Sequence, residues 1–382
     1  MNRIIAVLRA LGGAIRTTHR RRASRMSAMR NAALAVAIAA GLPTAAHAEP
    51  ERIAVDPGAD WQHAPTGIRL PPTLNGLQRD RITSFLAGDN NIGSTYFSPS
   101  EDEILSIYIY RSGSYDVSMM MDATAQSIFA NDRLGTVDTS AGLYANFGDA
   151  MIGEGSGLRT TYPVEGPFRS TGLAMFQRGD WLIKLRMSSK TGDAATLDKR
   201  LALIAAGLPL SPAAGKAPPA YRIAPCEDAR ALPKARRRDL EMTDWLLSTT
   251  AISLLYDSSE TAASFTPADA AGEQGRSILC RDASSQPGRM AYRHADSGEP
   301  YAIVFGDSGV VASVGSIGFA DENANPRPIL LTLGNGMRTQ FYRAFETMPP
   351  FEQMLEAVND EGFLAVVERT GDGSTISLPM GD

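Results

Sequence analysis

The chain has 382 residues, of which 43% are hydrophobic and 21% charged, with 35 glycines, 23 prolines and 2 cysteines. This composition excludes collagen-like, coiled-coil, disulfide-dense and wholly disordered proteins. The length predicts two domains of about 150 residues each. The formal net charge of −5 argues against a nucleic-acid partner.

The first 48 residues have the pattern of a secretory signal peptide. They carry eight arginines and no acidic residue, followed by an apolar run at residues 32–42 and then by Ala46-His47-Ala48. The apolar run has 11 residues, fewer than the roughly 20 that span a bilayer as a helix. We therefore expect cleavage between Ala48 and Glu49, and a periplasmic or secreted protein.

Removal of this leader changes the charge balance. The remaining 334 residues have a net charge of −13, and no run of 18 apolar residues among them predicts a transmembrane segment. An exported chain this acidic is not expected to bind nucleic acid or anionic lipid. Translation from Met1, Met26 or Met29 would leave the same cleavage site.

Both cysteines, Cys226 and Cys280, lie in the second half of the mature chain. An even number of cysteines in an oxidising compartment favours one disulfide between them. The alternative of two buried free thiols stays open, because spacing alone does not show whether the geometry allows a bond.

A proline-rich stretch divides the mature chain. Residues 208–219 contain four prolines among small residues, which cannot continue a helix or a central strand. We therefore predict an N-terminal domain over residues 49–208, a linker over 209–220 and a C-terminal domain over 221–382. Strands and helices follow one another in both halves, which predicts an α+β fold in which each domain is an antiparallel sheet with packed helices.

The first domain is expected to contain a strand followed by a helix. Residues 104–110 alternate apolar and polar side chains, which predicts a strand that buries Leu105, Ile107 and Ile109. The residues that follow have helical spacing of apolar side chains and predict a helix over about residues 116–131.

A hairpin and a second helix complete this domain. Residues 173–177 and 181–187 are predicted to form two strands joined at Arg178-Gly179-Asp180. In the second strand one face is predicted to carry Trp181, Ile183, Leu185 and Met187, and the other to carry Lys184, Arg186 and Ser188. A helix is expected from the N-cap candidate Asp193 to Gly207.

A strand that enters a long helix, the later sequence Gly-Asp-Trp-Leu-Ile-Lys-Leu-Arg at 179–186, and a closing amphipathic helix together resemble the PsbP-like fold. Exported proteins of the DcrB type share this architecture. The resemblance is confined to the first domain and rests on the order of elements. It implies a non-catalytic envelope or lumen protein that binds partners, and it implies no functional residues.

The second domain is expected to start with a helix and to continue as hairpins. Hairpin turns are predicted at Gly306–Gly309, at Asn335-Gly336, the latter as a type I′ turn, and at Gly371-Asp372-Gly373. The remaining expected elements are a helix over 239–256, strands over 301–305, 310–314, 329–333 and 338–343, a helix over 349–359, and strands over 363–369 and 374–378.

Gly306-Asp307-Ser308-Gly309 is also the tetrapeptide found around the nucleophile of chymotrypsin-like proteases. That chemistry needs a histidine base within hydrogen-bond reach of the serine. Outside the leader the chain has two histidines, His63 and His294. Because glycine, aspartate and serine are also typical turn residues, a structural role for the tetrapeptide is the alternative.

Metal ligands and cofactor motifs are not indicated. A His/Cys zinc site would need nearly every histidine and cysteine in the mature chain. The three methionines Met119–Met121 diverge by about 100° per residue on a helix, so they are predicted to fill a core and not to bind copper. We therefore expect no metal and no cofactor.

These patterns favour an exported, non-enzymatic protein that serves as a binding or envelope-associated module, with an unknown protein or small-molecule partner in the cell envelope. One alternative is a periplasmic serine hydrolase using Ser308 with His294 and an unidentified acid. Another is a small-ligand-binding protein with a pocket between its domains. The sequence assigns no catalytic, cofactor-binding or metal-binding residue.

Overall fold

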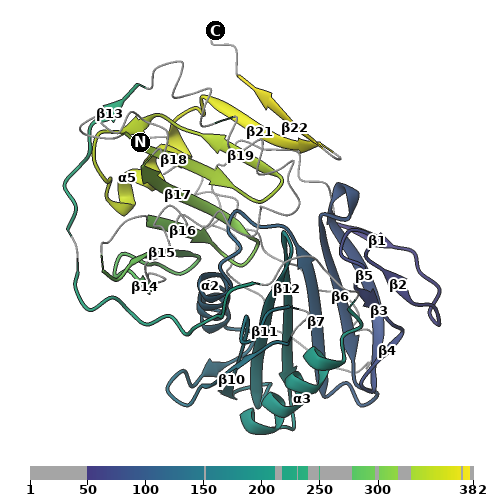
Figure 1. The fold of residues 1–382 in the computed structure, drawn as a ribbon. Helices are drawn as coiled ribbons and strands as arrows, with labels where there is room; N and C mark the ends of the chain where they lie inside the picture. The colour runs from purple at the N-terminus through teal and green to yellow at the C-terminus, as the bar shows by residue number, and fades with distance from the viewer. Residues whose placement is uncertain are drawn as a thin grey trace, which may run out of the picture. The chain divides into compact units, whose positions relative to one another are not determined.

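The computed structural model shows an α+β protein of two domains, each an antiparallel sheet with helices packed on it, as predicted (Figure 1). In Figure 1 the first sheet runs from purple to teal and the second from green to yellow. The described residues are 50–149, 152–210, 217–229, 231–239, 249, 278–296, 301–316, 328–370 and 373–378.

The first sheet is antiparallel at every strand pair that the structure describes. Along its path lie β1 (Glu51–Ile53), β5 (Leu77–Leu86), β6 (Asn91–Phe97), β7 (Glu103–Tyr110), β12 (Trp181–Ser189), β11 (Ser170–Arg178), β10 (Gly157–Glu165) and β8 (Thr136–Val137). Beside this path, β4 (Thr73–Leu74) pairs with β5 and β9 (Leu143–Phe147) pairs with β10, while β2 (Trp61–Gln62) and β3 (Arg69–Leu70) form a separate pair and a short 3-10 helix covers Ala87–Asp89.

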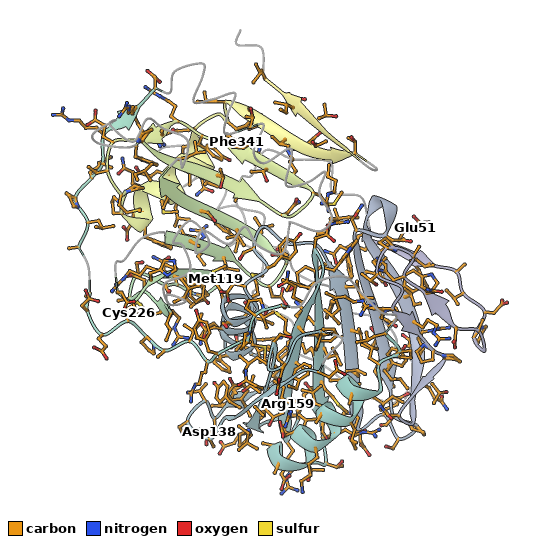
Figure 2. The ribbon with its side chains drawn as sticks, viewed as in Figure 1. Glu51, Met119, Asp138, Arg159, Cys226 and Phe341 are labelled. Atoms are coloured by element: carbon orange, nitrogen blue, oxygen red, sulfur yellow. A yellow bond between two sulfur atoms is a disulfide. The ribbon has the colours of Figure 1, made fainter. Side chains whose placement is uncertain are left out.

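Two helices of this domain begin where aspartates cap them. The side chain of Asp116 accepts a hydrogen bond from the backbone N–H of Met119 at the start of α2 (Val117–Phe129). Asp193 caps α3 (Ala194–Gly207) in the same way, through the N–H of Thr196. Both helices are confirmed close to their predicted bounds. Arg159 of β10, labelled in Figure 2, joins this strand to α3 through an ion pair with Asp198, 2.8 Å from Nε to Oδ1.

The central strands of the first sheet are buried on both faces. One face packs on α3 through Leu197, Leu201 and Ile204, in a cluster that includes the predicted apolar face of β7. The other face packs on α2, so β11 is buried along its whole length. The period-2 pattern indicated only one apolar face, and it therefore did not predict that Lys184 on the opposite face of β12 is buried too.

The second sheet is likewise antiparallel at each described strand pair. Its path contains β14 (Leu279–Arg281), β15 (Arg289–His294), β16 (Tyr301–Phe305), β17 (Val310–Ser316), β18 (Ile329–Gly334), β19 (Arg338–Phe341), β21 (Ala365–Thr370) and β22 (Gly373–Ser377). Beside it lie β20 (Ala344–Phe345), which pairs with β18, and β13 (Arg237–Arg238), which pairs with β20.

Helix α5 (Phe351–Asp360) covers one face of this sheet through Phe351, Met354 and Val358. Glu361, just after the helix, pairs with Arg237, and Glu356 of the helix pairs with Lys234. The helix expected over 239–256 falls almost wholly outside the described residues.

One turn differs from its prediction. Asn335 does not have the positive φ that a type I′ turn requires at both central residues, whereas Gly336 has φ of +79°. The side-chain oxygen of Asn335 instead accepts hydrogen bonds from the backbone N–H groups of Met337 and Arg338. The loop between β18 and β19 is therefore longer than the two-residue loop of a type I′ hairpin, and the side chain of Asn335 stabilises it.

The described ends of the proline-rich stretch are bound to the first domain. Leu208 and Ala220 are buried, and the backbone N–H of Ala217 donates to the carbonyl of Ile152. The N–H of Ala220 donates to the carbonyl of Gly155. The domain boundaries themselves stay predictions.

Among the described residues no helix is both long and apolar enough to cross a membrane.

Candidate functional site

The turn that contains Ser308 is the place where the sequence resembled a nucleophile motif. Phe305 of β16 pairs with Val310 of β17, so Gly306–Gly309 closes this hairpin, with positive φ at both glycines. Ser308 is exposed, and its Oγ contacts the carbonyl oxygen of Phe305 at 3.5 Å, the long limit of a hydrogen bond.

His294 does not reach this turn. The end of β15 that adjoins the turn is Arg289, which pairs with Phe305, whereas His294 lies at the other end and pairs with Leu279. The five residue steps along the strand from Arg289 to His294 correspond to about 16 Å. The Ser308–His294 pair that the hydrolase alternative requires is therefore not formed.

His63 has a structural environment of its own. It is buried, its Nε2–H donates to the carbonyl of Asp89 at 2.9 Å, and its Nδ1 accepts from the hydroxyl of Thr66 at 2.8 Å. Its ring packs edge-on against Trp181. Burial lowers the pKa of His63, so the neutral imidazole is favoured.

The Gly306–Gly309 turn binds the first domain. The Nζ of Lys184 on β12 donates to the backbone oxygen of Asp307 at 2.8 Å and to its carboxylate Oδ2 at 3.0 Å. The Lys184 side chain is 4% exposed and lies against the ring faces of Tyr108 and Tyr110, whereas Asp307 is 45% exposed. The turn thus supplies both an anionic and a neutral acceptor for a buried ammonium group.

The electrostatics of this pair favour its charged form. The charge of Lys184 lowers the pKa of the Asp307 carboxyl. Burial acts to lower the pKa of Lys184, but the carboxylate of Asp307 and the neighbouring tyrosines outweigh burial, so the pKa of Lys184 is raised.

The Gly306–Gly309 turn also contacts the first domain through its backbone. The N–H of Gly113 donates to the carbonyl of Gly309 at 2.8 Å, and the Ser112 hydroxyl donates to the same oxygen at 3.1 Å. A Cβ on Gly113 would lie 2.4 Å from the carbonyl oxygen of Gly334. Only glycine allows this approach without movement of the backbone.

We expect Asp307→Asn to lower the free energy of unfolding at pH 7 by about 1 kcal/mol, a small value because Asp307 is partly exposed. The pKa of Asp307 is below its ordinary value of 3.8 in the folded protein, so its contribution is present above that pH and is lost as the pH falls through the folded pKa. Thermal unfolding of both proteins between pH 7 and pH 3 measures the difference. A difference that stayed constant down to pH 3 would contradict a role for the carboxylate charge.

Asp180 lies at the centre of another cluster. Its Oδ2 pairs with guanidinium groups of Arg111, at the end of β7, and of Arg369 on β21. Arg111 also lies over the Trp181 ring, 4.2 Å from its centroid. In the predicted hairpin turn Arg178-Gly179-Asp180, confirmed by the positive φ of Gly179, the acid is therefore buried and bound.

Helix α2 carries the third charged contact between the domains. Both carboxylate oxygens of Asp122 accept from Arg281 of β14, at 2.7 and 2.9 Å, and Oδ2 also accepts from the Tyr292 hydroxyl at 2.9 Å. Burial nevertheless raises the pKa of Asp122. The three methionines of α2 are all buried, in a cluster that also contains Val304 and Met290 of the second sheet.

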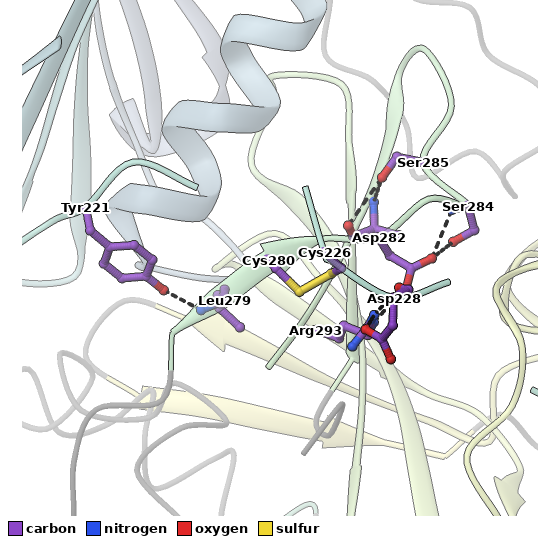
Figure 3. Close-up of a disulfide and its surroundings, with 10 residues drawn as sticks. Tyr221, Cys226, Asp228, Leu279, Cys280, Asp282, Ser284, Ser285 and Arg293 are labelled. Carbon is purple, nitrogen blue, oxygen red and sulfur yellow. Dashed lines mark hydrogen bonds and ion pairs between the residues drawn. A yellow bond between two sulfur atoms is a disulfide. The ribbon is translucent and has the colours of Figure 1, made fainter. Parts of the chain in front are cut away.

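The predicted disulfide between Cys226 and Cys280 is present (Figure 3). It joins the strand β14 to the segment of residues 221–226, which comes earlier in the chain. The backbone of this segment also pairs with β14, since Cys226 N–H donates to the Arg281 carbonyl and Arg281 N–H donates to the Ala224 carbonyl.

Beside the disulfide, buried Arg293 binds Asp282 at 2.8 Å and Asp228 at 2.6 Å. Tyr221, at the other end of the same segment, accepts a hydrogen bond from the Leu279 N–H at 2.8 Å (Figure 3).

Comparisons with known proteins do not identify a family. The chain matches no protein-family model and no curated protein. A crystal structure of a protein from Bacteroides thetaiotaomicron aligns with 66% of this chain and 88% of its own at 11% identity, with a TM-score of 0.19. That likeness does not establish a shared fold.

Sequence reasoning did not predict the partners in these contacts. It placed Asp180 in a hairpin turn and Lys184 on the polar face of a strand, but it assigned neither of them, nor Asp122, to a group far away in the chain. Conversely, Ala48 and Glu49 of the predicted cleavage site lie outside the described residues. Among the residues that are described, no three His, Cys, Asp or Glu side chains gather as a possible metal site.

Proposed function

We propose that this protein is an exported, non-enzymatic binding or envelope-associated module, periplasmic or secreted, with a protein or small-molecule partner in the cell envelope. The proposal rests on the leader, on the disulfide and on the contacts of the nucleophile-like motif Gly306–Gly309 with the first domain.

The position of β1 supports export with cleavage after Ala48. Strand β1 begins at Glu51 and pairs with β5 through Arg52 and Ile53. A chain that starts at Glu49 therefore retains every strand that the structure describes. The disulfide fits the same interpretation, because such bonds persist in oxidising compartments.

The observation that carries the non-enzymatic part is the binding of the Gly306–Gly309 turn by the first domain. Residues on both sides of Ser308 are held, Asp307 by Lys184 and Gly309 by Gly113. A nucleophilic serine needs a base beside it, and this turn instead supplies acceptors to groups of the other domain.

Export is tested with the full-length chain in a Gram-negative host. We expect the intact mass of the periplasmic protein to correspond to a chain that starts at Glu49, and Ala48→Tyr to block this processing. A chain lacking residues 1–48 is the control and should stay in the cytoplasm. A full-length chain that remained unprocessed in the cytoplasm would overturn export.

The non-enzymatic part is tested with a fluorophosphonate probe and the purified protein. We expect no labelling that depends on Ser308, with a serine protease as the positive control and Ser308→Ala as the matched variant. Labelling of the native protein that disappears in Ser308→Ala would overturn this part of the proposal.

Binding is tested by immobilising the protein and exposing it separately to envelope and cytoplasmic fractions. We expect one component to be retained from the envelope fraction and displaced by free protein. Retention of nothing, or equal retention from both fractions, would contradict a binding module of the envelope.

A further inference from the structure

The face of the first sheet that packs on α2 is only partly covered. The cluster around α2 contains side chains of β10, β11 and β12 but, among the described residues, none of β5 or β6. On the uncovered part the side chains of this face are half-buried, whereas those on the α3 face of the same strands are buried in its core. We call these half-buried side chains the open face: Arg81, Phe85, Thr95, Ser106, Tyr108 and Arg186.

Strand register aligns four polar side chains of the open face in one row. Arg186 of β12 lies opposite Ser106 of β7. Ser106 in turn lies opposite Thr95 of β6, and Thr95 lies opposite Arg81 of β5. Directly opposed residues point to the same face of a sheet. The row therefore has a guanidinium group at each end and two hydroxyls between them, and it crosses three strand spacings, or about 14 Å.

Two aromatic rings lie beside this row. Gly93 is the neighbour of Thr95 on the same face of β6, and a Cβ there would lie 2.7 Å from the ring of Phe85. The Phe85 ring therefore covers Gly93. Its centroid is 6.5 Å from that of the Tyr108 ring, with 33° between the two planes. The rings together form an apolar surface that adjoins the polar row.

The polar groups of the open face are available to a ligand. The hydroxyls of Thr95, Ser106 and Tyr108 form no hydrogen bond within the part of the chain that the structure describes. The guanidinium of Arg186 forms no ion pair or hydrogen bond there either. Arg81 pairs only with the neighbouring Asp80, at the surface, where such a pair contributes little.

The outer strands of the second sheet differ in this respect. Arg338 of β19 pairs with Glu368 of β21 and lies over the ring of Phe363. Its charge is therefore already matched within the domain, in contrast to that of Arg186.

The open face has the chemistry that recognises an acidic sugar. Hydroxyl groups both donate and accept hydrogen bonds, as sugar hydroxyls require. A guanidinium binds a carboxylate through two parallel hydrogen bonds, and aromatic rings cover the apolar C–H face of a sugar ring. An extended peptide binds a sheet through unpaired backbone at an edge, whereas the backbone of these strands is already paired on both sides.

The surrounding charges limit the size and charge of this ligand. The acidic mature chain repels a long polyanion. Asp307 interacts with the charge of Arg186, so a singly charged carboxylate fits beside it better than a doubly charged phosphate.

We propose that the open face binds a short oligosaccharide that carries carboxylates, laid across β12, β7, β6 and β5 with one carboxylate on Arg186. The sugar hydroxyls bond to Ser106 and Thr95, and one sugar ring lies against Phe85. This inference rests on the proposed binding function and names the chemistry of the small-molecule partner.

The first test is calorimetric titration of the purified protein with trigalacturonic acid at physiological salt. Its methyl ester keeps the sugar rings without the charges, and triglutamate keeps the charges without the rings. We expect trigalacturonic acid to bind and each of the other two to bind at least about tenfold more weakly. No binding of trigalacturonic acid, equal binding of its ester, or equal binding of triglutamate, which would indicate a site for acidic peptides, would overturn the proposal.

Variants of Arg186 test the anchor of the carboxylate. Arg186→Ala should weaken the binding of trigalacturonic acid at least about tenfold, and Arg186→Lys should fall between alanine and the native protein because it keeps the charge without the planar fork. The matched control is Arg69→Ala, at an exposed arginine of β3 whose side chain has no ion pair among the described residues. Equal affinity of Arg186→Ala and Arg69→Ala would place the ligand elsewhere.

A charge at the centre of the row tests the location independently. Ser106→Glu should abolish binding because its carboxylate repels that of the ligand. Ser377→Glu, at an exposed serine of β22 in the second sheet, should bind as the native protein does. Urea unfolding shows that each variant is folded, and a folded Ser106→Glu protein with native affinity would contradict the proposed site.

The envelope-retention experiment separates this inference from the proposed function on which it rests. We expect excess trigalacturonic acid to displace the component retained from the envelope fraction, and Arg186→Ala to retain less of it. A retained component that neither the oligosaccharide nor the variant affects would overturn the oligosaccharide site and leave the binding function in place.

Discussion

Asp180→Ala is expected to lower the free energy of unfolding by about 3 kcal/mol, because it removes the buried carboxylate that two largely buried guanidinium groups share. Arg111 follows β7, Asp180 lies in the β11–β12 turn and Arg369 is on β21, so the loss affects three segments far apart in the chain. Urea unfolding followed by circular dichroism measures the change.

Asp80→Ala is the control for this variant. Asp80 pairs with Arg81 at the surface, where both side chains are well exposed, and its loss should cost less than about 1 kcal/mol. Asp180→Asn keeps the shape of the side chain and should fall between alanine and the native protein. Equal stability of Asp180→Ala and Asp80→Ala would show that the charge at Asp180 is not important for the fold.

Loss of the disulfide should have the second large effect. Cys226 and Cys280 are 54 residues apart, and cross-linking a loop of that length removes chain entropy from the unfolded state worth about 4 kcal/mol in the simple model. We expect the Cys226→Ser, Cys280→Ser double variant to be destabilised by about this amount, measured by urea unfolding under oxidising conditions.

The matched control is the native protein unfolded with a thiol reductant present. If the bond alone is responsible, reduction should lower the stability of the native protein to that of the double variant and leave the double variant unchanged. A double variant as stable as the oxidised native protein would contradict the expectation and would indicate that the backbone bonds between Ala224, Cys226 and Arg281 suffice to hold this segment.

Local patterns predicted most elements of the fold. Asp193 marked the start of α3, and the alternation from residue 104 marked the buried face of β7, because capping and strand burial are written in neighbouring residues. The type I′ prediction at Asn335 failed because the same dipeptide can be held by its own side chain, which the pattern does not show.

Contacts between distant segments could not be predicted in this way. Lys184 and Asp307 are 123 positions apart in the chain. The alternation of apolar and polar residues in β12 identifies a polar face but does not predict which segment packs against it. The tetrapeptide around Ser308 could be recognised in the sequence, but Lys184 could not be identified as its partner. The sequence therefore did not distinguish a structural turn from a catalytic one. The backbone register of β15 and β16 distinguishes them.

The burial of α2 on all sides has a consequence for how the chain can be divided. Met119, Met120 and Met121 point in three directions, and all are buried in a cluster with side chains from both sheets. A fragment that ended at the proline-rich stretch would keep this helix but lose Val304 and Met290, which help to cover it. An isolated half would therefore expose apolar methionine side chains of α2 to water. The chain from Glu49 through both sheets is thus the form to express.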